Sequence, residues 1–357
     1  EVLRGCARGC RFCQAGMMYR PVRERSADNV VSSVLEGLAD TGYDEVSLTS
    51  LSSTDHSQIA DILTKLNHAC DGKGVRISLP SQRLDSFGVD MAELVAGQKK
   101  GGLTFAPEAG SQRLRDVINK NVTENDLERA TRAAFEAGWR RVKLYFMMGL
   151  PGERDEDIVA IANLADKTYE LAREVVPKAQ RGNVSVSISC SVFIPKAQTP
   201  FQWCAQTPDE EVKRRQQLLL ASVRNRAVRV HYHDADTSLL EAVLSRGGRD
   251  ITPLIVGAWK RGARFDAWTE QFDLSRWEDA AAELGIDLRA VASTPFDLDM
   301  RLPWEHVSPG VKRGFLEREY RKSLEGETTP DCTRTSCTGC GICPTIHASN
   351  VLVGERG

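Results

Sequence analysis

The first thirteen residues constrain this chain more than any other stretch. Cys6, Cys10 and Cys13 follow the apolar pair Val2-Leu3 at the spacing C-x3-C-x2-C. Glycines within the stretch allow a tight loop, so the three thiolates can converge on one metal centre. An iron–sulfur cube has four irons, and three local cysteines leave one of them without a nearby protein ligand. Such an open position is what a catalytic metal centre needs, whereas a structural centre closes its shell.

The stretch resembles the cluster-binding loop of the radical S-adenosylmethionine (radical SAM) enzymes, including the aromatic residue Phe12 before the third cysteine. The resemblance implies that Cys6, Cys10 and Cys13 hold a 4Fe–4S cluster and that Phe12 lies at the cofactor. In that family the open iron binds the amino and carboxylate groups of S-adenosylmethionine, and an electron from the cluster cleaves it to methionine and a 5′-deoxyadenosyl radical. A zinc knuckle or an incidental group of cysteines is the alternative, because a motif match is a hypothesis.

Composition excludes several other classes of protein. The 357 residues, 41% of them hydrophobic, suffice for one large domain or two ordinary ones. A net charge of −2 gives no overall attraction to nucleic acid or acidic membranes, and no apolar run approaches the roughly 18 residues of a membrane span. Seven of the ten cysteines fall in two tight groups, which indicates metal binding in a reducing cytoplasm rather than a disulfide framework.

The position of the cysteine loop also bears on the N-terminus. The chain starts without Met, five residues before Cys6. A frayed terminus supports a site poorly. We therefore expect a further N-terminal segment, of up to a whole domain, before residue 1.

Strand and helix patterns alternate along the first two thirds of the chain. Strand patterns occur after the loop at 45–49, 75–79, 103–105, 141–147 and 184–193, and helical patterns at 28–41, 57–69, 90–98, 123–137, 154–174 and 208–224. With the apolar pair before the loop these make six units, which indicates a parallel sheet in an incomplete barrel rather than the eight units of the full one. The radical SAM fold is such a partial (β/α)6 barrel.

The pattern changes after residue 224. One more strand pattern, at 228–232, precedes helical patterns at 237–246, 251–261 and 273–284. We therefore predict an α/β chain with a radical SAM partial barrel over 1–224, a mainly helical C-terminal domain over 225–325 and a Cys-rich tail over 326–357. The helical domain holds four of the six tryptophans, and we expect its core to use these rings, with a Trp-rich substrate surface as the alternative. They are Trp259, Trp268, Trp277 and Trp304.

Polar residues after two strands are candidates for cofactor binding. The carboxylate of Glu108 can accept hydrogen bonds from ribose hydroxyls or pair with an ammonium group. The resemblance implies that it contacts S-adenosylmethionine, and a solvated loop glutamate is the alternative. Ser52 and Ser53 stand where many radical SAM proteins carry a Gly-Gly-Glu motif, so hydroxyls replace that motif here. They are candidates to bind the methionyl group, and an ordinary Ser-rich turn is an equal alternative.

Two later segments also resemble family motifs. Gly149 and Gly152 lie in a segment that resembles the fifth-strand motif, where backbone lies against adenine, and glycines permit such a close approach. Residues 193–196 resemble the sixth-strand segment of certain radical SAM enzymes. His231 and His233 share one face of the strand pattern at 228–232; a structural role is favoured, and an acid–base role is open.

The tail carries a second group of cysteines at the spacing C-x4-C-x2-C-x2-C, namely Cys332, Cys337, Cys340 and Cys343. Four thiolates this close can fill a tetrahedral shell, and part of the spacing resembles bacterial ferredoxin loops. A second iron–sulfur cluster and a structural zinc are both open, and we favour the cluster because a radical enzyme must receive electrons.

The whole arrangement resembles the radical SAM subgroup with a cobalamin-binding domain ahead of the barrel and a Cys-rich C-terminus. This resemblance implies an enzyme that makes a deoxyadenosyl radical and receives electrons from a partner such as flavodoxin or ferredoxin. Cobalamin-dependent methyl transfer is one use that such an enzyme makes of the radical, and the substrate is unassigned. An RNA-modifying methylthiotransferase is a second hypothesis, with basic groups that could touch phosphates at 140–141, 213–215 and 321–322. A non-catalytic iron–sulfur electron carrier or zinc-stabilised binding module is a third.

Overall fold

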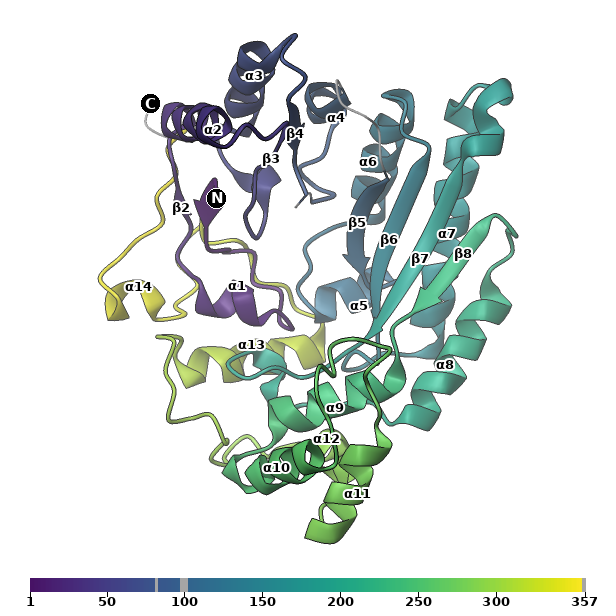
Figure 1. The fold of residues 1–357 in the computed structure, drawn as a ribbon, viewed down its shortest axis with the longest axis vertical. Helices are drawn as coiled ribbons and strands as arrows, with labels where there is room; N and C mark the ends of the chain where they lie inside the picture. Colours follow the sequence, from purple (N-terminus) through teal and green to yellow (C-terminus); the bar gives the residue numbers. More distant parts are fainter. Residues whose placement is uncertain (81–82, 97–101, 355–357) are drawn as a thin grey trace.

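Four parallel strands form the central sheet of the molecule (Figure 1). Strand β6 pairs with β7 along its whole length, from Arg141 opposite Ser185 to Met148 opposite Val192. The computed structural model describes residues 1–80, 83–96 and 102–354. In spatial order, the four strands are β5 (Leu103–Glu108), β6 (Arg141–Met148), β7 (Ser185–Val192) and β8 (Val228–Tyr232).

Shorter strands continue the barrel beyond β5 (Figure 1). Strands β3 (Glu45–Ser47) and β4 (Arg76–Ser78) are parallel to each other. The amide of Val2 donates to the carbonyl of Thr49 at 3.0 Å, which places the segment before β1 (Leu3–Arg4) beside the end of β3. The fold is therefore the predicted partial barrel. Its sheet continues into β8, past residue 224, where the sequence places the boundary of the first domain.

Helices cover the outer side of these strands, and those that the sequence predicts have bounds within a few residues of the predicted ones. Residues 112–117 also form a helix, which no sequence pattern predicted. The capping box of Thr123 and Asp126 is present, and Gly42 ends its helix in the left-handed conformation at φ 68°. Residues 97–98 of one predicted helix lie outside the described residues. The helices are α2 (Ala27–Thr41), α3 (Ile59–Cys70), α4 (Val89–Ala96), α5 (Gln112–Val117), α6 (Glu124–Glu136), α7 (Asp155–Val175) and α8 (Asp209–Ser222).

The C-terminal helices gather at one end of the sheet (Figure 1). They are α9 (Ala235–Arg246), α10 (Thr252–Lys260), α11 (Ser275–Leu284), α12 (Leu288–Ser293) and α13 (Arg313–Glu325). None of the helices in the described residues is long and apolar enough to cross a membrane.

The prediction that the tryptophans of this region form its core is wrong for two of the four. Trp277 is buried and Trp304 packs partly buried, but Trp259 is 54% and Trp268 61% exposed. Helix α10 turns Ala258 toward the core, and Trp259, one residue further on, is rotated by about 100° to the outside.

The tail returns to the N-terminal end of the chain. Val351 forms a β-bridge with Arg23 in β2 (Arg23–Glu24), and the amide of Val351 donates to the carbonyl of Val22 at 2.8 Å. Strand β2 in turn pairs antiparallel with β1. The tail also carries the short helix α14 (Ile342–Thr345), near α1 (Gln14–Met18) in Figure 1. The fold thus brings both groups of cysteines to the same side of the molecule.

Candidate functional site

A cavity of about 310 Å³ lies between the cysteine loop and the segments that follow β3, β4 and β5. It unites most of the predicted site residues, since the three cysteines of the loop, Phe12, Ser52 and Glu108 all line it. Two cations that the sequence did not single out, Arg83 and Lys120, line it as well. The remaining lining residues are Gly16, Leu51, Pro80, Thr104 and Ala106.

The three loop thiols lie close enough to affect one another. Burial, together with the neighbouring Cys10, raises the pKa of Cys6 to about 11 and also raises the pKa of Cys13. The nearby charges of Arg83 and Lys120 act in the opposite direction on Cys6 and Cys13 respectively. Thiolates therefore need a positively charged partner here, and a bound metal supplies one.

The donor set suits a cluster better than a single ion. No group of three or more His, Cys, Asp or Glu side chains in the described ranges is arranged to hold one metal ion. An iron–sulfur cube takes each thiolate on a different iron, so it accepts thiolates that are further apart. Cys6, Cys10 and Cys13, lining one cavity beside two cations, fit that group.

The loop adopts the tight turn that its glycines predict. Gly5 and Gly9 have φ of 90° and 78°. A Cβ atom on Gly5 would lie 2.3 Å from the carbonyl oxygen of Pro21 and 2.4 Å from that of Tyr19. No side chain fits there, so Gly5 is required for the path of the loop.

Glu108 is held inside the cavity rather than solvated on a loop. It has a φ of 69°, and one carboxylate oxygen accepts from the Lys120 ammonium at 3.1 Å. Lys120 stands between Asn119 and Asn121, which have φ of 52° and 53°. Asn tolerates this left-handed conformation better than most residues. The Asn-Lys-Asn triplet is thus a sequence signal for a tight turn at Lys120. No comparable signal marks Arg83.

The two serines have different places. Ser52 lines the cavity and donates to Asp55 at 2.6 Å. Ser53 is fully buried and donates to the carbonyl of Leu48 at 3.0 Å, so its hydroxyl is used within the turn. Of the two, Ser52 is the one within reach of a ligand.

Gly149 and Gly152 form the turn after β6, with φ of 86° and 73°. The amide of Gly149 donates to Glu153 at 2.7 Å, and a Cβ atom there would meet the Thr207 hydroxyl at 2.9 Å. Neither glycine lines the cysteine cavity or the second cavity described next. Their contact with adenine stays a prediction.

A second cavity, of about 230 Å³, shares Phe12 with the first. It lies at the carboxyl ends of β6, β7 and β8. Its polar residues are Ser191, Lys196, His233, Ser238 and Glu241. Lys196 and Glu241 form an ion pair. His233 lines this cavity, and its strand neighbour His231 does not.

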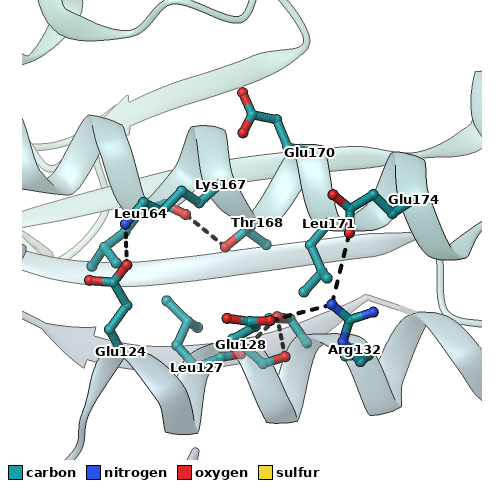
Figure 2. Close-up of a pocket in the computed structure, with 11 residues that line it drawn as sticks. Glu124, Leu127, Glu128, Arg132, Leu164, Lys167, Thr168, Glu170, Leu171 and Glu174 are labelled. Atoms are coloured by element: carbon teal, nitrogen blue, oxygen red, sulfur yellow. Dashed lines mark hydrogen bonds and ion pairs between the residues drawn. The ribbon is translucent and has the colours of Figure 1, made fainter.

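A third hollow, of about 260 Å³, lies on the outside between α6 and α7 (Figure 2). Figure 2 shows ion pairs across it, from Lys167 to Glu124 and from Arg132 to Glu174. None of the predicted site residues lies here. The hollow belongs to the packing of two helices, not to the candidate site.

The tail cysteines are neighbours but less enclosed. Cys340 is buried, Cys337 is exposed, and the other two are intermediate. Burial raises the pKa of Cys332 and of Cys343, and Cys340 adds to both increases. The amide nitrogen of the Asn350 side chain lies 3.7 Å from the Cys332 sulfur.

Among the basic groups proposed for RNA, Arg214 and Arg215 are paired with carboxylates. Arg214 bonds to Asp155 and Glu211, and Arg215 bonds to Glu153 at 2.5 Å. Their charges are therefore mostly offset within the protein.

Comparisons with known proteins agree with this geometry. Residues 1–165 match the model of the radical SAM superfamily. An uncharacterised protein of Methanocaldococcus jannaschii is 31% identical over 282 residues, which cover 76% of this chain and 59% of the relative. A second uncharacterised protein of that organism is 21% identical over 175 residues, 44% of this chain and 34% of its own length. The chain thus spans less than two thirds of the length of these curated relatives.

Two solved structures are distantly similar. Methylornithine synthase aligns with a TM-score of 0.39 at 13% identity, over 63% of this chain and 68% of that one. The cobalamin-dependent S-adenosylmethionine radical enzyme OxsB aligns with a TM-score of 0.42 at 12% identity, over 79% of this chain and 46% of that one. Similarities this low carry no argument about function. The family match identifies the first part of the chain: residues 1–165 form a radical SAM domain.

Proposed function

We propose that this protein reductively cleaves S-adenosylmethionine to methionine and a 5′-deoxyadenosyl radical in the cysteine cavity. The observation that carries the proposal is that Cys6, Cys10 and Cys13 line one cavity together with Glu108 and Lys120. A 4Fe–4S cluster on these three cysteines would supply the electron and one iron open to the substrate.

The Glu108–Lys120 pair suits the amino acid part of S-adenosylmethionine. That part is a zwitterion with one ammonium and one carboxylate group. An amino nitrogen that gives its lone pair to the open iron is no longer an ammonium but keeps its N–H donors. Glu108 would accept from one of these N–H groups and Lys120 would donate to the carboxylate, in place of their own ion pair at 3.1 Å. Ser52, which lines the same cavity, adds a hydroxyl.

Arg83 and Lys120 have a second effect on the same site. Three thiolates and a carboxylate would concentrate negative charge in a largely buried cavity, which is costly without compensation. The two cations offset part of that charge. They also draw the carboxylate of S-adenosylmethionine toward the loop.

The second cavity is our candidate for the molecule that the radical attacks. Phe12 lines both cavities, so a substrate there would be next to the cofactor. Its hydroxyl, imidazole and ion-paired groups suit a polar substrate. More specifically, we propose that the radical serves cobalamin-dependent methyl transfer to this substrate. The test is whether added methylcobalamin changes the products.

We further propose that Cys332, Cys337, Cys340 and Cys343 hold a second iron–sulfur cluster. A zinc ion is the alternative, and it would require the four thiolates to move closer together than they are in this structure. Their mutual effect on thiol pKa supports a shared site, and Gly339 and Gly341, with φ of 75° and 92°, bend the backbone between them. A cluster there would accept electrons from a donor such as flavodoxin or ferredoxin in the cytoplasm. Membership of an enzyme superfamily disfavours the non-catalytic carrier, and RNA as a substrate stays an untested alternative.

The test is cleavage of S-adenosylmethionine by anaerobically reconstituted protein after reduction with dithionite. We expect 5′-deoxyadenosine from the wild type and none from Cys10→Ala. The control is Cys70→Ala, because Cys70 is buried and isolated at the end of α3 and should not matter. Equal activity of Cys10→Ala and the wild type would refute the proposal.

A further inference from the structure

Arg11 lies between the second and third cysteines of the loop, yet it does not line the cavity and is completely buried. Its guanidinium donates to one carboxylate oxygen of Glu319 in α13, at 3.1 and 3.3 Å. It also donates to the carbonyls of Val117 at 2.9 Å and Glu327 at 2.6 Å. The loop is therefore bonded to a helix 308 residues further along the chain.

Asn119 makes a second connection between the same segments. Its side-chain amide donates to the carbonyl of Gly9 in the loop at 3.0 Å and to the carbonyl of Thr329 at 3.0 Å. The amide of Thr329 donates back to Asn119 at 2.8 Å, and its hydroxyl donates to Glu319 at 2.8 Å. The bonds form a closed network from Gly9 through Asn119, Thr329 and Glu319 to Arg11.

The network is buried throughout, since Asn119 and Arg11 are 0% and Glu319 2% exposed. Removing one partner from a buried ion pair leaves an uncompensated charge. Here that charge would be on Arg11, next to Cys10. Net charge near an iron–sulfur cluster sets its reduction potential, and an added positive charge favours the reduced form.

We propose that Glu319 and Thr329 are positioning residues for the cluster. Through Arg11 and Asn119 they fix the loop that carries the three cysteines, and the Glu319 carboxylate offsets the charge of Arg11 beside the cluster. The helical region after the barrel is thus part of the support of the active site. This inference rests on the proposed function, since it requires a cluster on Cys6, Cys10 and Cys13.

The test compares Glu319→Gln with the wild type after anaerobic reconstitution. Gln keeps the size and one acceptor oxygen but removes the negative charge. We expect less iron and sulfide per chain and a more positive midpoint potential for the cluster that does form. The potential is followed on the paramagnetic resonance signal that S-adenosylmethionine perturbs, which separates it from any cluster on the tail.

Two further variants assign the cause. Arg11→Met combined with Glu319→Gln removes both charges, so the shift in potential should largely disappear. Thr329→Val removes a hydrogen bond without changing charge, so it should lower cluster content and leave the potential unchanged. If Glu319→Gln alone does not fold, the cluster content of Thr329→Val against the wild type carries the test. Asp166→Asn is the control, because Asp166 is buried in α7 and bonds to the amides of residues 224 and 225.

Three outcomes would overturn the inference. The first is wild-type iron content and potential in Glu319→Gln. The second is a potential shift in the double variant as large as in the single one, because the charge of Arg11 would then not be its cause. The third is a wild-type cluster content in Thr329→Val. If the wild type itself forms no cluster that S-adenosylmethionine perturbs, the proposed function fails. If the wild type forms such a cluster and the variants have the same cluster content and potential, only this inference fails.

Discussion

The cysteine loop at 6–13 and the cysteine tail at 332–343 have similar spacings but different surroundings. The loop lines a cavity of about 310 Å³ with a carboxylate and two cations. The tail has one exposed and one buried cysteine, and none of its cysteines lines that cavity. Spacing alone therefore does not separate the two groups of cysteines, whereas the charged groups that line the loop cavity make it suited to a charged ligand.

The two regions are nevertheless joined. Arg8 of the loop pairs with Asp331, the residue before the first tail cysteine, at 3.4 Å. Arg20 donates to the carbonyl of Gly16 at 2.8 Å, and its charge also acts on Cys332 and Cys343. A metal in the tail would thus lie near the loop without sharing its ligands.

The largest expected difference between the two regions is in the cleavage reaction. With dithionite as reductant, Cys6→Ala should abolish 5′-deoxyadenosine formation, because no other side chain of the loop is a good iron ligand. Cys340→Ala should retain most of it, since dithionite can reduce the loop cluster directly. Product is measured by chromatography, with Cys204→Ala as a buried control. Complete loss in Cys340→Ala would contradict the separation of roles.

A second difference should appear in the reactivity of the metal-free thiols. A pKa of about 11 for Cys6 leaves roughly one thiol in a thousand ionised at pH 8. Iodoacetamide should therefore label the exposed Cys337 before Cys6. The rate at Cys6 should rise about tenfold per pH unit between pH 8 and 10 as the thiolate forms. Equal labelling of both by mass spectrometry would argue against a buried loop.

The cavity side of the comparison is tested by Glu108→Gln. Loss of one charge-assisted hydrogen bond to S-adenosylmethionine should cost about 1.5–3 kcal/mol, or roughly 10- to 150-fold in affinity, at unchanged iron content. Calorimetric titration measures it. Glu128→Gln, in the outer hollow of Figure 2, is the control and should bind normally. An unchanged affinity in Glu108→Gln would remove this residue from the site.

The tail side is tested by removing Cys6, Cys10 and Cys13 together. We expect this variant to keep about half or less of the wild-type metal, as iron with sulfide or as nearly one zinc per chain. Metal analysis after anaerobic reconstitution measures it. If the variant folds but contains neither iron nor zinc, the tail does not bind metal.

Local signals predicted most of the fold. The capping box at Thr123 and the helix-ending Gly42 act within a few residues of their own positions, so the sequence displays them. The cysteine spacing is local in the same sense. Burial in the helical region was predicted less well, because whether Trp259 faces the core depends on how α10 packs against other helices.

The charged part of the site was harder to predict. Arg83 reaches the cavity from a segment with no motif, and the sequence signal for Lys120 is limited to the asparagines on either side of it. The bond between Arg11 and Glu319 spans 308 residues and has no periodicity or spacing to mark it. Long-range partners of this kind are fixed by the tertiary fold, so a single sequence does not display them.

The most direct measurement of the central claim is the paramagnetic resonance spectrum of the reduced wild-type protein before and after S-adenosylmethionine is added. Three cysteines in one cavity predict a cluster with one iron open to the ligand, so the spectrum should change on addition and should not change in Cys13→Ala. A fully loaded wild-type cluster whose spectrum is the same with and without S-adenosylmethionine would contradict the account.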